Sequence, residues 1–199
     1  MSVPTPYTGT MPLAELIELL QLVAFIKRRG VRFLQEWATA SPVPEVRDGL
    51  RRQIAQEEHH LTLVRECLRT LGSKEDASYQ DADLENAFQI VAAAPQEVEK
   101  LAGFYRSIKE YSVARCAAMI ALADPQTQQT MDAVSDDEER AQRWGESLRL
   151  KLSPTPELQR DGNMMRARIL DHTAKSRERL ARQLQEKARR ALQDIVSNT

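Results

Sequence analysis

Glu57 and His60 are the two residues whose types and spacing most directly suggest chemistry. They form a Glu-x-x-His step within a helical pattern, and residues three apart project from neighbouring points of one helix face. A carboxylate and an imidazole placed in this way can bind one metal ion together. The sequence therefore predicts that Glu57 and His60 are metal ligands.

A second glutamate, Glu138, lies in a matching environment. Apolar residues recur around both glutamates at alternating spacings of three and four, which is typical of a helix packed into a bundle. Burying an unpartnered carboxylate costs on the order of several kcal/mol, so each glutamate should face a cation, a metal ion or a hydrogen-bonding group. The two series are Leu50, Ile54, Glu57, Leu61, Val64, Leu68 and Leu71, and Met131, Val134, Glu138, Ala141, Gly145, Leu148 and Leu152.

The composition favours helices as the elements that position these side chains. Only 7 of the 199 residues are glycine and 5% are aromatic, while Ala, Leu, Glu, Gln and Arg, all good helix formers, are abundant. The formal net charge of -1 gives the whole chain no electrostatic attraction to nucleic acid. We expect an all-α protein.

Prolines and glycines divide the chain, since proline cannot continue a helix and glycine commonly ends one. We expect a flexible leader over residues 1–11, a bundle over 12–152 and a C-terminal amphipathic helix within 153–199. Residues 73–94 should form a long crossover that carries a short helix. The expected long helices cover residues 12–40, 45–71, 95–123, 125–152 and about 163–196.

The two halves of the expected bundle align with each other. Pro44 lies thirteen residues before Glu57, and Pro125 lies thirteen residues before Glu138. One offset therefore superposes the turn of each hairpin and its central glutamate. This repeat indicates two similar helical hairpins joined by the crossover.

The segments Gln56-Glu57-Glu58-His59-His60 and Asp137-Glu138-Glu139-Arg140-Ala141 resemble the motif helices of ferritin-like di-iron carboxylate proteins. The resemblance covers about residues 12–152 and implies an antiparallel four-helix bundle of two hairpins, followed here by a fifth helix. It also implies that each motif helix supplies Glu-x-x-His and each other helix one carboxylate. The implied cofactor is iron, used to activate oxygen or peroxide or held in store, with manganese or zinc as alternatives.

Two features of the sequence depart from the family's ligand pattern. Ala141 stands where the second histidine is expected, and residues 24–29, which should lie level with Glu57, contain no carboxylate. Reflection across the turn at Asp124 brings Glu110 level with Glu138, on a face of small residues. The predicted metal ligands are therefore Glu57, His60, Glu138 and Glu110.

Two hypotheses for function follow. The first is a metal-associated protein that binds iron or acts as a di-iron-type oxidoreductase. The second is a metal-free scaffold in which Lys27, on the same helix face as Leu20, Ala24 and Leu34, neutralises Glu57. That scaffold would bind a protein or a small molecule through the bundle or the C-terminal helix. No catalytic residue can be assigned, and whether the protein is an enzyme stays open.

The C-terminal helix combines a basic surface with a narrow apolar stripe. Between Met164 and Arg190 the chain has nine Lys or Arg and three acidic residues, a local net charge of +6. The segment has no aromatic residue to stack on a base, so nucleic acid is not the favoured partner. Because the stripe must be buried, we expect it to contact the bundle or the same helix of a second copy in a homo-oligomer.

The remaining signals concern the cellular compartment. Cys67 and Cys116 show no Cys-x-x-Cys spacing, and no signal-peptide pattern is visible, which favours a reducing cytoplasm. Charges such as Lys27, Arg28 and Arg29 interrupt every long apolar stretch, so no membrane span is expected.

Overall fold

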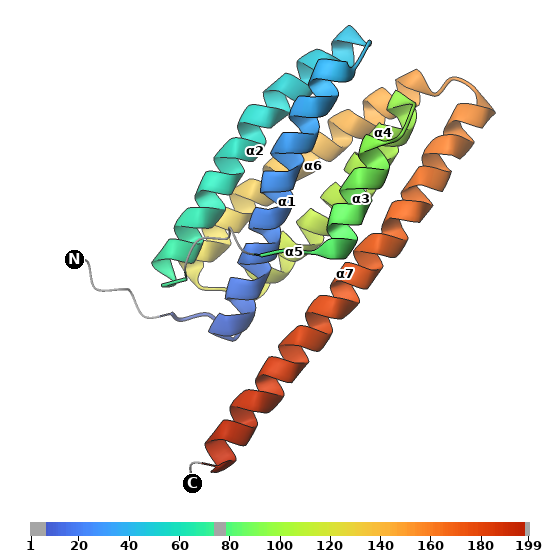
Figure 1. The fold of residues 1–199 in the computed structure, drawn as a ribbon. Helices are drawn as coiled ribbons and strands as arrows, with labels where there is room; N and C mark the ends of the chain where they lie inside the picture. Colours follow the sequence, from blue (N-terminus) through green and yellow to red (C-terminus); the bar gives the residue numbers. More distant parts are fainter. Residues whose placement is uncertain (1–6, 74–78, 198–199) are drawn as a thin grey trace.

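The computed structural model describes residues 7–73 and 79–197, and all regular secondary structure in them is helical. Helix α1 (Leu13–Ala40) and helix α2 (Pro44–Thr70) pack side by side as an antiparallel hairpin (Figure 1). Helix α2 ends at Thr70, and Gly72, two residues further on, has a φ of 74°, the left-handed conformation that glycine adopts readily. These boundaries confirm the predicted first hairpin.

The second hairpin pairs an interrupted helical rod with helix α6 (Pro125–Leu152). The rod consists of α4 (Glu97–Gly103), a π-helical turn η2 (Phe104–Ile108) and α5 (Lys109–Leu122). The Asp124 carboxylate caps α6 by accepting hydrogen bonds from the Gln126 and Thr127 amides. The predicted turn at Asp124 is therefore confirmed.

The π-helical turn is a difference from the uninterrupted helix expected over residues 95–123. The Lys109 amide donates to the Phe104 carbonyl, five residues earlier, whereas an α-helix bonds four residues apart. The wider turn rotates the residues that follow it about the helix axis. A residue's position along the bundle axis is therefore shifted when it is estimated from regular α-helical spacing across this turn.

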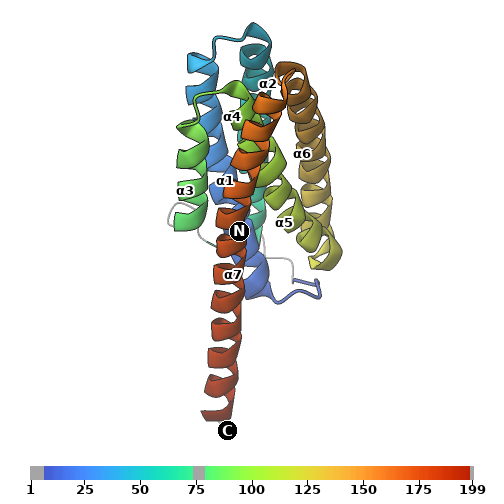
Figure 2. The ribbon, with the colours of Figure 1, turned by 90° about the vertical axis from the view of Figure 1, so that its right-hand side faces the viewer.

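Helix α3 (Ala82–Ala92) lies in the connection between the hairpins, as expected of the crossover; residues 74–78 fall outside the described part. Helix α7 (Pro156–Ser197) runs along the bundle and extends past the other helices at its C-terminal end (Figure 1 and Figure 2). It begins earlier than the expected residue 163 and continues through Gly162, which packs closely on Val98. A Cβ atom at Gly162 would lie 3.2 Å from the Val98 side chain.

The first half of α7 is part of the bundle, packed against α3, α4 and η2. A buried hydrogen-bonded chain fixes it: Tyr111 on α5 contacts Ser176 (3.0 Å), and Ser176 donates to Asp81 beside α3 (2.7 Å). Arg179 adds an ion pair to Asp83 at 2.5 Å. Only the C-terminal part of α7 extends free of the other elements in both views.

The described part of the expected leader, residues 7–11, is bound to the bundle rather than loose. The Thr10 and Met11 amides both donate to the Leu122 carbonyl at 2.9 Å, and the Met11 side chain is buried. The last carbonyls of a helix lack partners within it, so α5 offers the leader an attachment point. Residues 1–6 lie outside the described part of the chain.

Close packing of two glycines against aromatic rings holds α6 to the neighbouring helices. Gly145 on α6 faces Tyr105, where an added Cβ would lie 2.3 Å from the ring, and Gly49 on α2 faces Trp144 in the same way. The Tyr105 hydroxyl donates to the Gln53 amide oxygen at 2.6 Å. These contacts position α2, α6 and the rod around the centre of the bundle.

Within residues 7–73 and 79–197, no helix combines the length and the apolar content that crossing a lipid bilayer requires.

Candidate functional site

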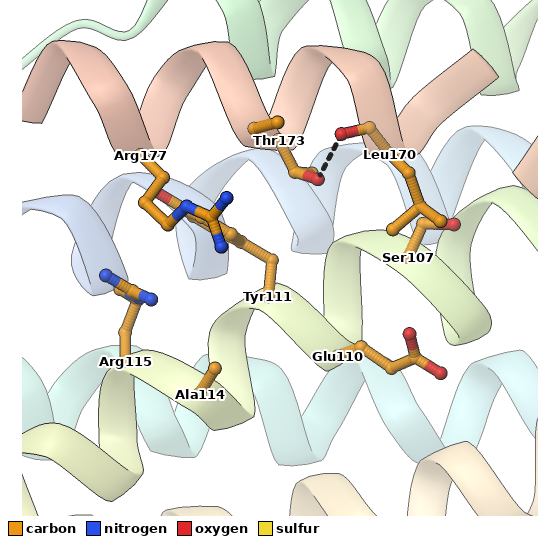
Figure 3. A pocket seen from close by; sticks show the side chains of 9 residues that line it. Ser107, Glu110, Tyr111, Ala114, Arg115, Leu170, Thr173 and Arg177 are labelled. Atoms are coloured by element: carbon orange, nitrogen blue, oxygen red, sulfur yellow. Dashed lines mark hydrogen bonds between the residues drawn. The ribbon is translucent and has the colours of Figure 1, made fainter. Parts of the chain in front are cut away.

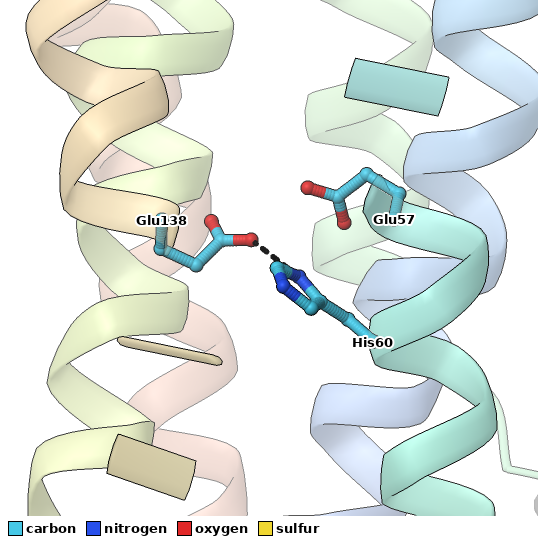
Figure 4. A group of neighbouring side chains, drawn as sticks. All are labelled: Glu57, His60 and Glu138. Atoms are coloured by element: carbon cyan, nitrogen blue, oxygen red, sulfur yellow. Dashed lines mark ion pairs between the residues drawn. The ribbon is translucent and has the colours of Figure 1, made fainter. Parts of the chain in front are cut away.

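Three of the four predicted ligands meet at the centre of the bundle. Glu57 and His60 on α2 face Glu138 on α6 (Figure 4). All three side chains are buried, and one donor atom from each lies within 4.8 Å of the others. The prediction that the two central glutamates share one site is thus matched by the geometry.

Two lysines lie between these glutamates. Lys27 on α1 has its Nζ 3.3 Å from Glu57 Oε2 and also donates a hydrogen bond to Glu138. Lys109 on α5 has its Nζ 3.0 Å from Glu138 Oε1 and also donates to Glu57. Each lysine therefore binds both glutamates, and we call Lys27, Glu57, Lys109 and Glu138 the lysine–glutamate quartet.

The quartet is balanced in charge and shielded from solvent. Its exposed fractions are 0% for Lys27, 3% for Glu57, 3% for Lys109 and 1% for Glu138. Burial acts to lower the pKa of Lys27, but the Glu138 and Glu57 carboxylates outweigh burial and raise that pKa. Burial likewise acts to raise the pKa of Glu138, but the Lys109 and Lys27 ammonium groups hold it well below its ordinary value. Lys27 and Glu138 therefore keep their charges in the folded protein.

His60 extends the quartet toward the surface. Its Nε2 lies 3.0 Å from the Asp137 carboxylate, and its Nδ1 lies 3.6 Å from Glu138 Oε1 (Figure 4). Burial acts to raise the pKa of Asp137, but hydrogen bonds from Gln56 and His60 bring it below its ordinary value. Two buried atoms, His60 Nδ1 and Glu138 Oε2, have no hydrogen-bond partner in the described chain.

Two further ionisable residues near the quartet, Cys116 and Tyr105, are held in their neutral forms. Burial raises the pKa of the Cys116 thiol to about 12, and burial together with the two glutamates raises that of Tyr105 well above its ordinary value. A thiol with such a pKa is protonated at neutral pH and is a poor nucleophile. Neither residue is therefore prepared for nucleophilic chemistry.

The fourth predicted ligand, Glu110, is not brought to this site. Its side chain is 42% exposed and pairs with Arg166 on α7, with Oε2 and Nη2 3.2 Å apart. The small-residue face on which Glu110 lies packs against α7, as shown by Gly103, where a Cβ would meet Met165 and Ile169. Lys109 occupies the central position instead.

Lys109 was missed by sequence reasoning although a signal for it exists. Lys109, Ser112, Cys116 and Met119 recur at spacings of three, four and three, and all four are buried in α5. This series has the same period as the seams around Glu57 and Glu138. Lys109 is the first residue of this series and the one member with a charged side chain, and this charge within a buried series was the signal in the sequence.

A divalent metal ion does not fit this set of groups while both lysines are protonated. The donors are Glu57, His60 and Glu138, and the charge of both carboxylates is already balanced by ammonium groups in direct contact. An added ion would bring two uncompensated positive charges into a buried site, which is strongly unfavourable. Ala141 also offers no donor where the family resemblance implies a histidine.

Comparison with known proteins finds no matching family model, no matching curated protein and no matching solved structure.

Proposed function

We propose that this chain is a metal-independent, ferritin-like helical protein that acts by binding another molecule at its surface. The observation that carries the proposal is the quartet, in which both central carboxylates contact both lysines. A carboxylate already neutralised by a buried ammonium group has little to gain from a metal ion. Because the four residues of the quartet are buried, their charged groups are not exposed to a substrate.

The positions of the two lysines support the ferritin-like part of this proposal. The family resemblance implies one carboxylate from each helix that lacks the Glu-x-x-His motif, and Lys27 and Lys109 lie on those two helices, α1 and α5. Their ammonium groups supply at the centre the positive charge that metal ions would otherwise bring. The bundle can thereby keep its two glutamates without a cofactor.

Metal analysis tests the proposal. The untagged protein, purified and then incubated with ferrous iron, manganese and zinc in separate samples, should hold less than about one tenth of an equivalent after gel filtration. The Glu57→Gln/Glu138→Gln variant, which lacks both central carboxylates, sets the background for adventitious surface ions. Stoichiometric metal in the wild type that this variant loses would contradict the proposal.

A second candidate function is the metal-associated one, as an iron-binding protein or an oxidoreductase. The observation that favours it is the pair of buried, unpartnered atoms His60 Nδ1 and Glu138 Oε2, which lie among the Glu57, His60 and Glu138 donors. Metal binding there requires at least one lysine to lose its proton or leave the quartet. The same metal analysis decides between the two candidates.

We further propose that the projecting end of α7 joins copies of this chain into a homo-oligomer. The apolar stripe of the sequence continues there through Ala188, Leu192 and Ile195, and the end of α7 extends past the other helices. A chain ending at Gln185 keeps the Ser176 and Arg179 contacts. Light scattering should give it a smaller assembly than the full chain; an equal number of subunits would refute this role.

A further inference from the structure

A cavity of about 260 Å³ lies between α5 and α7, separate from the quartet (Figure 3). Figure 3 shows Arg115 and Arg177 at one end, with Ser107, Glu110 and Leu170 at the other. Two small side chains, Ala114 on α5 and Ala174 on α7, line the cavity. Its two ends differ sharply in charge.

The positive end has no counterion within the described chain. Neither Arg115 nor Arg177 forms an ion pair with a described carboxylate, whereas Arg166 and Arg179 on the same face of the bundle bind Glu110 and Asp83. Arg115 Nε is buried without a hydrogen-bond partner among the described residues. The Arg115 guanidinium lies 5.1 Å from the centre of the Tyr111 ring, which orients it.

The rest of the cavity is mainly apolar. Leu170, which is 37% exposed, lines it together with Ala114 and Ala174. At the far end, the Ser107 hydroxyl is buried and lacks a hydrogen-bond partner among the described residues. The Glu110 carboxylate there is already paired with Arg166. A ligand that fills the cavity therefore contacts positive charge at one end and apolar surface beside it.

We propose that this cavity binds a small organic carboxylate with a short apolar body. A guanidinium group donates two parallel hydrogen bonds that match the two oxygens of a carboxylate, and two such groups without counterions lie at one end of the cavity. Inorganic phosphate would satisfy the arginines but leave the surface of Leu170 and the two alanines uncovered. The inference gives a ligand class to the proposed binding role and does not depend on the state of the quartet.

Isothermal titration with hexanoate tests the inference on the full-length protein. Hexanoate should bind at one site per chain, while hexan-1-ol and inorganic phosphate at equal concentrations should bind at least about tenfold more weakly, since each lacks one of the two recognised features. Arg115→Gln and Arg177→Gln should each weaken hexanoate binding by about tenfold or more. Arg160→Gln, at an exposed position of α7 outside the cavity, should leave it unchanged.

A variant that fills the cavity tests whether hexanoate binding needs the space inside it as well as the charge of the arginines. Ala174→Phe keeps both arginines but occupies the space beside Leu170, so it should abolish hexanoate binding while its circular dichroism and melting temperature show an intact fold. The inference is overturned if hexanoate fails to bind the wild type, if phosphate or hexan-1-ol binds equally well, or if the arginine or Ala174→Phe variants bind it unchanged. None of these results alters the metal analysis, so failure here is distinguishable from failure of the metal-independent role.

Discussion

The Nζ atom of Lys109 lies 3.0 Å from Oε1 of Glu138, and this contact joins α5 to α6 at the centre of the bundle. Glu138 also binds Lys27 on α1, while Lys109 also binds Glu57 on α2. Four helices thus meet through two cations and two anions. Removing one member leaves the remaining charges unbalanced in a buried site, which makes the quartet directly testable.

Replacing Lys27 with methionine should destabilise the fold by about 3 to 5 kcal/mol, because two buried carboxylates are then left with one ammonium group between them. Urea unfolding followed by circular dichroism gives the free energy of unfolding. Adding Glu138→Gln in the same chain should recover much of the loss, since charge balance returns. Equal instability of the single and double variants would show that lost packing of the lysine side chain, rather than lost charge balance, causes the destabilisation.

An exposed ion pair provides the matched control for this measurement. Lys151 pairs with Glu45, and their side chains are 63% and 53% exposed. Solvent screens such a pair, so Lys151→Met should change the free energy of unfolding by no more than about 1 kcal/mol. A loss as large as that of Lys27→Met would mean that removing any lysine destabilises this protein.

Exchanging the two lysines for carboxylates should create a metal site at the centre of the bundle. In Lys27→Glu/Lys109→Glu the centre would hold four carboxylates beside His60, a donor set suited to divalent iron or manganese. Without metal this variant should be unstable, because four buried negative charges repel. Refolding with and without manganese, followed by metal analysis, should show metal-dependent folding with bound metal.

The Lys27→Met/Lys109→Met variant is the control for that experiment, since it removes both cations without adding donors. It should gain less metal than the four-carboxylate variant. Folding of Lys27→Glu/Lys109→Glu that is indifferent to manganese would indicate that the added carboxylates turn away from the centre. That result would remove the support for equating the lysine positions with ligand positions of the ferritin-like family.

Gly145→Ala should destabilise the protein by roughly 1 to 3 kcal/mol, because a Cβ there would lie 2.3 Å from the Tyr105 ring, which packing must then displace. Gly30 in α1 is the matched control: a Cβ at that position meets no atom closer than 3.8 Å. Gly30→Ala should therefore be neutral or stabilising by up to about 1 kcal/mol, as expected within a helix. Thermal unfolding of both variants checks the pair, and equal effects would contradict the role given to Tyr105.

Much of the fold could be predicted from the sequence because prolines and a glycine mark several helix ends clearly. Pro44, Gly72 and Pro125 act through local backbone chemistry, so they fix helix ends whatever the tertiary structure. The start of α7 was placed less well, at about residue 163 instead of Pro156, and the helix continues through Gly162, where the absence of a side chain allows close packing against Val98. That contact is long-range and leaves no local signal.

The candidate site was predicted in part for a similar reason. Glu57 and Glu138 interrupt regular apolar series, so their burial followed from periodicity, and a similar series indicated Lys27 as a counterion. His60 followed from its position three residues after Glu57. Lys109 was missed because reflection across Asp124 gives only the level along α5, and the helix face was then chosen by its small residues. That face packs against α7, so the estimate selected Glu110, which pairs with Arg166 on α7, instead of its neighbour Lys109.

The last prediction concerns pH. The pKa of Glu138 is held well below its ordinary 4.5, so the stability that its charge contributes is present above about pH 4.5 and is lost as the pH falls through the lowered folded-state value. The pKa of Lys27 is raised above its ordinary 10.5, so its contribution is present below that pH and is lost as the pH rises through the raised folded-state value. The free energy of unfolding should therefore fall at both extremes in the wild type. In Lys27→Met/Glu138→Gln both groups are uncharged at every pH, so the decline should be shallower below pH 4.5 and above pH 10.5. Parallel profiles for the two proteins, measured by urea unfolding across this range, would show that the quartet does not control the pH dependence.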